Sequence, residues 1–355
     1  MKIVAVRSYL TSMALTKPYT IAYNTFSDVS LVFFEVELEN GMVGFGSGSP
    51  AKEVVGESTA QTVANLQTEF VQNFVGKDIR QFQQIIFDTI KHFPHLPGTQ
   101  AAIDIALHDA FCKFIGISVA NFYGRKIKAL PTSVTIGIKN VQDTLLEAKD
   151  YQSLGFKVLK VKTGIDVNED IEKVLKLKEN FGNHFSIRVD ANQGYKLDDL
   201  KKFITATKHQ GLELIEQPMP VGTEAELLNL SWEERKLLAA DESLKDPQAA
   251  LKLAANEKPF GIYNIKLMKC GGIFGALGIS NIAHNSEIDL FWGCNDESTI
   301  SITAALHVAY ACPNTKYIDL DGSFDLAEDL VKGGFEIEEG VMKINDAPGF
   351  GFTLL

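Results

Sequence analysis

Charged and polar residues recur at the ends of apolar stretches between residues 135 and 321, about every 25 residues. They are Thr135, Lys160, Lys162, Asp190, Glu216, Asp241, Lys266, Asn295, Asp319 and Asp321. One strand and one helix of an eight-stranded barrel of ~250 residues together take roughly 25 to 30 residues. Because the carboxyl ends of all strands in such a barrel meet on one face, the spacing predicts that these carboxylates and ammonium groups form one active site.

Three of these residues, Asp190, Glu216 and Asp241, are acids that end consecutive predicted strands. Unpaired carboxylates a few ångströms apart repel one another strongly. A hard divalent cation removes this repulsion, and ligands made only of oxygen favour Mg²⁺ or Mn²⁺ over zinc. The alternative is that each acid pairs with a lysine or caps a helix, but three acids in consecutive units favour a metal site.

Lys160 and Lys162 are separated by one residue in the stretch FKVLKVKTG, so they point to the same face of a strand. The strand is apolar, which predicts that both ammonium groups reach into the barrel mouth. Crowding them together is expected to lower the pKa of one, which makes it a usable base. Lys266 lies on the sixth predicted strand, nearly opposite the second, so a base is expected on each side of a bound carbon. An ion pair of Lys266 with Asp241 or Asp296 is the alternative.

A divalent cation with lysines on both sides suits the removal of a proton next to a carboxylate. That proton is very weakly acidic, and the enediolate that forms carries additional negative charge. Cations in a dry site stabilise this charge, and such electrostatic stabilisation is typically the largest contribution to catalysis. The residues therefore predict proton-transfer chemistry at the α-carbon of a carboxylic acid.

From residue 131 onward, strand-like and helical stretches alternate, which indicates an α/β fold. Apolar runs of this kind are typical of parallel strands buried on both faces. Eight such units favour a closed (β/α)8 barrel, which we place at residues 126–322, over an open sheet. The predicted strands are SVTIGI, FKVLKVKT, FSIRVDAN, LELIEQP, KLLAADES, IYNIKLMK, EIDLFWGC and KYIDLDG, and helices are expected at VQDTLLEAKDYQSLG and NEDIEKVLKLKENFG.

The first 125 residues do not follow this alternation and predict an α+β capping domain. Strand-like stretches at 1–10 and 29–39 lead through Asn40-Gly41 into MVGFG, which is a hairpin signal. Helical patterns follow at about 57–74 and 99–115. The stretches 16–28 and 46–58 are expected to be polar surface loops. The strand-like tail, residues 323–355, is expected to return to this domain.

The composition restricts the partners and the compartment. The formal net charge is -11, which argues against a nucleic acid or an anionic membrane as a partner. No run of 18 apolar residues occurs, and the first 20 residues lack the apolar segment of a signal peptide. A cytoplasmic protein is therefore predicted. A homo-oligomer is expected as well, although the composition does not indicate it. Its cysteines are widely spaced without a CxxC pair and read as reduced: Cys112, Cys270, Cys294 and Cys312.

Five motifs occur in a fixed order: Lys160-x-Lys162, Asp190-Ala-Asn192, Glu216-Gln-Pro218, Asp241-Glu242-Ser243 and Lys266-Leu-Met-Lys-Cys-Gly271-Gly272. Together they resemble the enolase superfamily, in particular its muconate-lactonizing-enzyme subgroup, over essentially the whole chain. The resemblance implies that the three acids bind Mg²⁺ and that Lys162 and Lys266 are the acid/base catalysts. It also implies that Lys160 supports Lys162 and the enediolate, with Asn192 and Glu297 as supporting residues.

Members of this subgroup catalyse cycloisomerisation, dehydration to succinylbenzoate, N-acylamino acid racemisation or dipeptide epimerisation. Asp319-Leu-Asp321 resembles the Asp-x-Asp pair by which dipeptide epimerases hold the free α-ammonium group of the substrate. A site rich in cations repels an ammonium group unless dedicated anions receive it. The resemblance therefore implies epimerisation by 1,1-proton transfer at the α-carbon of the C-terminal residue. A helix cap or an Asx-turn is the alternative for Asp321.

One residue of the capping loop indicates which dipeptide is preferred. Epimerases that act on Ala-Glu carry an arginine there, and Asn24 stands at the matching position, which favours a small or apolar dipeptide such as Ala-Ala. Asp296 facing the pocket would instead favour a cationic side chain, ranked second, and Thr135 is a further candidate substrate contact. The alternatives are an N-acylamino acid racemase, an o-succinylbenzoate synthase, and a barrel that binds a ligand without turnover.

Overall fold

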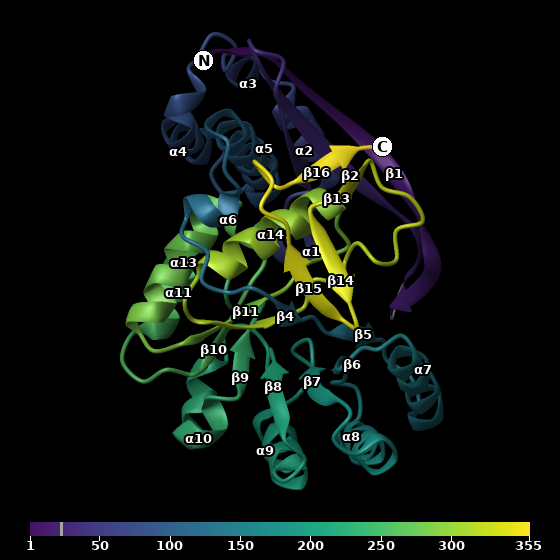
Figure 1. Cartoon of the computed structure of the whole chain (residues 1–355). Helices are drawn as coiled ribbons and strands as arrows, with labels where there is room; N and C mark the ends of the chain where they lie inside the picture. Colours follow the sequence, from purple (N-terminus) through teal and green to yellow (C-terminus); the bar gives the residue numbers. More distant parts are fainter. Residues whose placement is uncertain (22–23) are drawn as a thin grey trace.

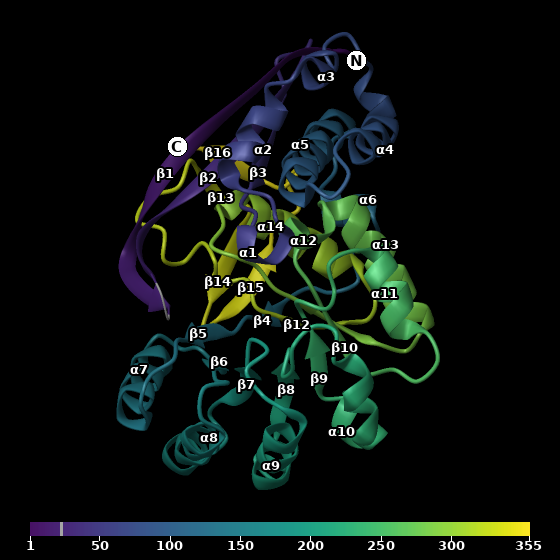
Figure 2. The ribbon, with the colours of Figure 1, turned by 180° about the vertical axis from the view of Figure 1, so that it is seen from behind.

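The computed structural model describes the chain at residues 1–21 and 24–355, without the side chains of residues 17–21 and 24–26. Two parts are visible in Figure 1, an N-terminal layer of strands and helices and a barrel beneath it. Figure 2, from behind, shows the barrel helices arranged around the strands. Within the described residues, no helix combines the length and the apolar character that a membrane span needs.

The described residues form one eight-stranded parallel sheet in which each strand neighbours the next along the chain. A parallel bridge between Thr132 and Ile318 joins the two edges, so the sheet closes into a barrel. This confirms the predicted (β/α)8 architecture. The strands are β5 (Val134–Ile136), β6 (Val158–Lys162), β7 (Ser186–Asp190), β8 (Leu212–Glu216), β9 (Leu238–Ala240), β10 (Ile262–Ile265), β11 (Asp289–Trp292) and β12 (Thr315–Ile318).

The barrel helices begin and end where the sequence provides caps. The Asp166 side chain accepts hydrogen bonds from the amides of Asn168 and Glu169 at the start of α8, and Gly182 ends that helix at a φ of 56°. The helices are α7 (Val141–Ser153), α8 (Val167–Phe181), α9 (Leu197–Thr207), α10 (Trp232–Arg235), α11 (Pro247–Ala254), α12 (Leu267–Cys270), α13 (Ile273–Asn285) and α14 (Thr299–Ala311), with a 3-10 helix η2 (Glu224–Asn229).

The N-terminal layer is a three-stranded antiparallel sheet packed on helices. Its long helix α5 lies so close to the third strand that a Cβ atom at Gly44 or Gly46 would meet the helix backbone. The elements are β1 (Ile3–Ile21), β2 (Asn24–Leu38), β3 (Val43–Gly48), α1 (Lys52–Val55), α2 (Thr59–Leu66), α3 (Glu69–Gln72), η1 (Ile79–Gln81), α4 (Phe82–His92), α5 (Pro97–Ile115) and α6 (Val119–Phe122).

The prediction of a loop at residues 16–28 is wrong for the described residues, because β1 and β2 continue through most of it. Tyr19 pairs with Phe26 and Ile21 with Asn24, and the register shifts between Ala14 and Tyr19, around a proline that cannot donate to the ladder. Residues 22–23 of this stretch lie outside the described residues. The predicted loop at 46–58 contains the end of β3 and all of α1, and α4 was not predicted.

Two acids of α5 attach the rest of the chain to the N-terminal layer. Asp104 of α5 accepts hydrogen bonds of 3.0 Å from the amides of Ile273 and Phe274, which begin α13 and have no partner within that helix. Asp109 of α5 accepts a bond of 3.1 Å from the amide of Phe350 in the tail. The tail strands are β13 (Val331–Gly333), β14 (Phe335–Glu338), β15 (Val341–Ile344) and β16 (Phe352–Leu354), and β15 also pairs with β4 (Leu130–Pro131). The boundaries at 125 and 322 stay predictions.

Candidate active site

The predicted catalytic residues lie around one end of the barrel. Lys162 ends β6 and Lys266 directly follows β10, and these strands are four positions apart in the ring, on opposite sides. The three acids lie on the strands between them. Asp190 ends β7 in register with Lys162, Glu216 ends β8 in register with Asp190, and Asp241 directly follows β9.

Lysines and carboxylates meet in direct ion pairs at this end. The Nζ of Lys162 lies 2.7 Å from Asp190, and the Nζ of Lys160 lies 2.7 Å from Glu216. The Nζ of Lys266 lies 3.0 Å from Asp241. The side chains of Lys162 and Lys266 are 28% and 15% exposed, whereas Lys160 is 5% exposed. The two outer lysines can therefore reach a bound molecule, while Lys160 is buried among the acids.

Electrostatic shifts follow from this crowding of buried charges. Burial, together with the negative charges of Asp190 and Asp241, raises the pKa of Glu216 to about 8. Burial also acts to raise the pKa of Asp241, but Lys266 and Lys269 hold it below its ordinary value. Burial acts to lower the pKa of Lys160, and its neighbouring carboxylates outweigh this and raise it well above the ordinary value. The expectation that crowding near a metal lowers the pKa of one of the two lysines stays a prediction.

The three acids provide oxygen donors suited to a hard divalent cation. In the described part of the chain, no three acidic, histidine or cysteine side chains converge in a ready metal-binding geometry, and each of these carboxylates contacts a lysine. The Oε2 atom of Glu216 is buried, and the Nζ of Lys160 lies 2.7 Å from it. The three acids offer only oxygen atoms, which a hard divalent cation prefers as ligands, so the residue set fits Mg²⁺.

Two polar residues support these acids and were not predicted as site residues. The Nδ2 of Asn264 donates to Oε1 of Glu216 over 2.6 Å, and the buried Nζ of Lys269 contacts the carboxylate of Asp241 and donates to its carbonyl over 2.6 Å. The sequence contains a feature that could have indicated each of these two residues. Lys269 belongs to the same motif as Lys266, and Asn264 is a polar residue inside an otherwise apolar strand.

Left-handed backbone at the strand ends orients two of the acids. Asn192 has a φ of 40°; its amide donates to Asp190 over 2.9 Å, and its side-chain oxygen accepts from Lys162 over 3.0 Å. Gln217 has a φ of 30°, and its side-chain oxygen accepts from the amide of Asp241 over 2.9 Å. Such conformations are costly for residues other than glycine and concentrate at functional sites. Asn192 therefore contacts both Lys162 and Asp190, and its supporting role stays a prediction.

Asp319 and Asp321 follow β12, next to the first strand of the barrel. Asp319 contacts the Nζ of Lys160 at 2.9 Å, and Asp321 accepts a hydrogen bond of 3.0 Å from the amide of Thr135. Burial and the charge of Asp319 raise the pKa of Asp321 to about 7. The Asp321 carboxylate thus bonds across the barrel closure, which differs from the helix-cap role considered for it.

The remaining predicted residues lie beside this site or outside the description. Glu297 is buried and accepts from the amide of Asn295 over 2.9 Å, and burial raises its pKa to about 7. Asp296 is half-buried and lines a surface hollow. Asn24 begins β2, and its side chain is not described.

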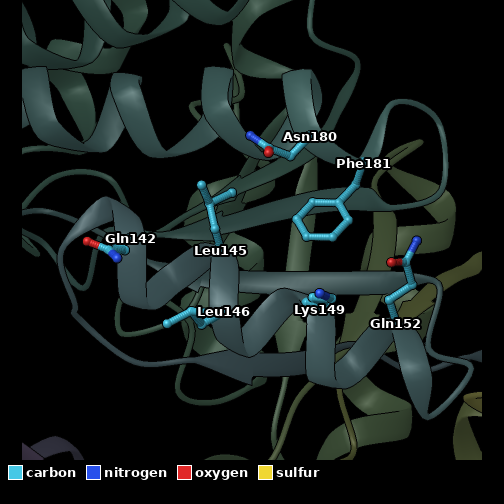
Figure 3. A pocket seen from close by; sticks show the side chains of 7 residues that line it. All are labelled: Gln142, Leu145, Leu146, Lys149, Gln152, Asn180 and Phe181. Carbon is cyan, nitrogen blue, oxygen red and sulfur yellow. The ribbon is translucent and has the colours of Figure 1, made fainter.

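The surface hollow lies between the N-terminal layer and the loop after β11. Both of its acids, Asp28 and Asp296, belong to segments far apart in the sequence. It is lined by Asp28, Val29, Ser30, Ser49, Pro50, Ala51, Thr59, Asn295 and Asp296. A second hollow lies outside the barrel between α7 and α8, where Leu145, Lys149 and Phe181 are among its lining residues (Figure 3). This second hollow contains none of the predicted catalytic residues.

Two family models match the chain. The model described as the mandelate racemase / muconate lactonizing enzyme N-terminal domain matches residues 4–124, and the model described as enolase C-terminal domain-like matches residues 143–355. A metal-assisted barrel enzyme of the enolase type is the class that the fold and the site define. The chain belongs to the mandelate racemase / muconate lactonizing enzyme family of the enolase superfamily.

Similar proteins cover the whole chain. An L-Lys-D/L-Arg epimerase from Desulforapulum autotrophicum is 46% identical over 99% of each chain. The dipeptide epimerase from Methylococcus capsulatus, solved with Mg and L-Arg-D-Lys, is 42% identical with a TM-score of 0.97 and covers 99% of this chain and 100% of its own. The dipeptide epimerase from Enterococcus faecalis, solved with Mg and L-Leu-L-Tyr, is 33% identical with a TM-score of 0.90, over 99% of this chain and 100% of its own.

Proposed function

We propose that the protein is a Mg²⁺-dependent dipeptide epimerase, and that its substrates carry cationic side chains. The single observation that carries the proposal is the placement of Lys162 and Lys266 on opposite sides of the barrel mouth, with the three acids between them. A site that only binds a ligand does not need two opposed bases. The relatives named above support the same reaction class.

The two lysines exchange a proton with the α-carbon of the C-terminal residue of the dipeptide. One lysine removes the proton from one face, and the other returns a proton to the opposite face, which inverts the configuration. Either lysine can begin, depending on which stereoisomer binds. Mg²⁺, held by Asp190, Glu216 and Asp241, would bind the substrate carboxylate and stabilise the negative charge that develops there.

Asp319 and Asp321 receive the free α-ammonium group of the dipeptide. In the structure, the Nζ of Lys160 lies 2.9 Å from Asp319 and 2.7 Å from Glu216, so a cation already occupies the space beside Asp319. A charge-assisted bond to the substrate ammonium uses the same carboxylate. An N-acylamino acid or a succinylbenzoate precursor has no such group, and the Asp pair would have no function with those substrates.

Asp28 and Asp296 favour a cationic side chain over the Ala-Ala preference predicted from Asn24. Both acids line the hollow that adjoins the site, since Asn295 of the same hollow donates its amide to Glu297. The amide of Glu297 in turn donates to the carbonyl of Gly322, next to Asp321. Relatives named for Lys and Arg substrates support this ranking, and a small or apolar dipeptide becomes the second candidate.

A dipeptide library in D2O with Mg²⁺ tests the proposal. We expect L-Arg-L-Lys and related cationic dipeptides to gain one deuterium at the C-terminal α-carbon, measured by mass spectrometry, and to do so faster than L-Ala-L-Ala. The variant Lys343→Ala, which changes an exposed lysine on β15, serves as a control that keeps full activity. Faster exchange in L-Ala-L-Ala would instead support the preference for small or apolar dipeptides that the sequence predicted. Exchange in N-acylamino acids alone would identify a racemase and overturn the proposal.

A further inference from the structure

The stretch at residues 132–135, which leads into the first barrel strand β5, holds the Asp319–Asp321 segment at several atoms. The side-chain oxygen of Thr132 accepts from the amide of Leu320 over 2.9 Å, and the amide of Thr135 donates to Asp321 over 3.0 Å. Between them, the hydroxyl of Ser133 donates to Oδ1 of Asp319 over 2.5 Å. The segment proposed to receive the substrate ammonium is therefore fixed from across the barrel closure.

Ser133 and Lys160 occupy different oxygen atoms of the Asp319 carboxylate. Ser133 bonds to Oδ1, while Lys160 donates to Oδ2 over 2.9 Å. An ammonium group of the substrate can replace or join Lys160 at Oδ2 only if the carboxylate keeps its present orientation. Ser133 is fully buried, so its bond to Oδ1 is shielded from water and fixes that orientation.

Arg188 determines the direction of the Ser133 bond. Its Nη1 lies 3.1 Å from the Ser133 hydroxyl oxygen and 2.5 Å from the carbonyl oxygen of Ile318. A guanidinium group only donates hydrogen bonds, so the Ser133 oxygen must accept from Arg188. The single hydroxyl proton of Ser133 is then left for Asp319.

The position of Arg188 inside the barrel has an electrostatic cost that local partners offset. The side chain is 2% exposed, and an unpaired buried cation is strongly unfavourable. Glu213 accepts from its Nε over 2.7 Å, and the guanidinium carbon lies 5.5 Å and 5.1 Å from the ring centroids of Phe291 and Tyr317. Arg188 is therefore fixed on its other sides and presents one donor to Ser133.

We propose that Ser133, oriented by Arg188, is a positioning residue that sets the selectivity of this enzyme for substrates with a free α-ammonium group. This inference rests on the proposed function and adds residues to it. A purely structural role predicts a different result, because a loosened barrel closure would impair all substrates alike. A positioning role impairs only substrates that use Asp319.

The test compares two substrates in two variants. The substrates are L-Arg-L-Lys and its analogue without the N-terminal amino group, and the measurement is kcat/KM for α-deuterium uptake in D2O with Mg²⁺. For Ser133→Ala we expect kcat/KM to fall about tenfold or more for the dipeptide, since a bond to a charged group is lost, and to stay nearly constant for the analogue. Ser47→Ala is the matched control, because the buried hydroxyl of Ser47 has no hydrogen-bond partner in the described part of the chain.

The melting temperature shows whether Ser133→Ala folds. If it does not fold, a second variant is used in its place. Arg188→Lys retains the buried charge but loses the planar set of donors of the guanidinium group. We therefore expect kcat/KM to fall for the dipeptide and not for the analogue, by a smaller factor than in Ser133→Ala. Equal losses for both substrates in the folded variants, or no loss for the dipeptide, would overturn the inference. The proposed function is judged separately on the parent enzyme. If that enzyme does not prefer the dipeptide over its analogue, the proposed role of Asp319 fails, and the role of Ser133 fails with it.

Discussion

The two sides of the barrel mouth hold their carboxylates in different ways. Between β6 and β10, Asp190, Glu216 and Asp241 contact lysines directly, in a dense array of buried opposite charges. At the closure between β12 and β5, a backbone amide holds Asp321, and Asp319 contacts the hydroxyl of Ser133 as well as the Nζ of Lys160. On the proposed function, we infer a division of labour, in which the charged groups of the first side transfer protons and the donors of the second side hold the group that binds the substrate ammonium.

The largest expected effect is on the first side. Lys266→Ala should lower the epimerisation rate by about 10²- to 10⁴-fold, the usual contribution of an acid/base group. Exchange of the α-proton should survive for one stereoisomer through Lys162, as measured by deuterium uptake. Loss of exchange for both isomers, in a variant that folds like the parent, would contradict the division between two bases.

On the second side, Asp321→Asn should reduce kcat/KM for free dipeptides by about 10- to 100-fold, because one charge-assisted bond to the ammonium becomes a neutral one. The analogue without the amino group should be processed as before. If both substrates lose the same factor, Asp321 contributes to catalysis or folding rather than to ammonium binding.

A smaller change in substrate preference is expected for variants of the surface hollow that Asp296 lines. Asp296→Asn should lower the preference for L-Arg-L-Lys over L-Ala-L-Ala by about tenfold or less, since the acid is only half-buried and solvent screens it. Competition between the two dipeptides in one reaction measures this preference. The matched variant Asp289→Asn, at an exposed acid at the start of β11, should leave it unchanged.

The smallest effect is a dependence on pH. Asp321 has a raised pKa of about 7, so the free enzyme carries it protonated and neutral below that pH. Attraction to the substrate ammonium is then weakened, and kcat/KM for dipeptides should fall as the pH drops through about 7. The profile of the analogue without the amino group should lack this step, and so should the profile of Asp321→Asn. A step of equal size in all three would assign it to another group, such as Glu297.

Most of the fold could be predicted because a parallel strand and its helix are encoded locally. Each predicted barrel strand overlaps an observed one, and residues such as Lys162 and Asp190 lie at strand ends that the apolar runs delimit. The extension of β1 through residues 16–21 and of β2 over residues 24–28 was not predicted, since the polar and proline-containing sequence resembles a loop. Pairing between the two strands supplies backbone partners that composition does not reveal.

The supporting residues were harder to predict because they depend on contacts between distant segments. Ser133 and Asp319 are 186 positions apart and meet only when the barrel closes. Arg188 is visible in the sequence as a charge within an apolar strand, but its partners are not. The sequence motifs indicate the candidate catalytic residues, whereas the contacts made in the closed barrel determine how these residues are oriented. The oligomeric state and the cytoplasmic location stay predictions.

The most direct test of the two-lysine chemistry starts from both stereoisomers of one substrate. L-Arg-L-Lys and L-Arg-D-Lys are incubated separately with the enzyme and Mg²⁺ in D2O, and nuclear magnetic resonance follows the α-proton of the second residue. We expect each isomer to convert into the other, with one deuterium incorporated at that carbon. Exchange without conversion of either isomer, or no exchange with bound Mg²⁺, would contradict a pair of bases on opposite faces of the substrate.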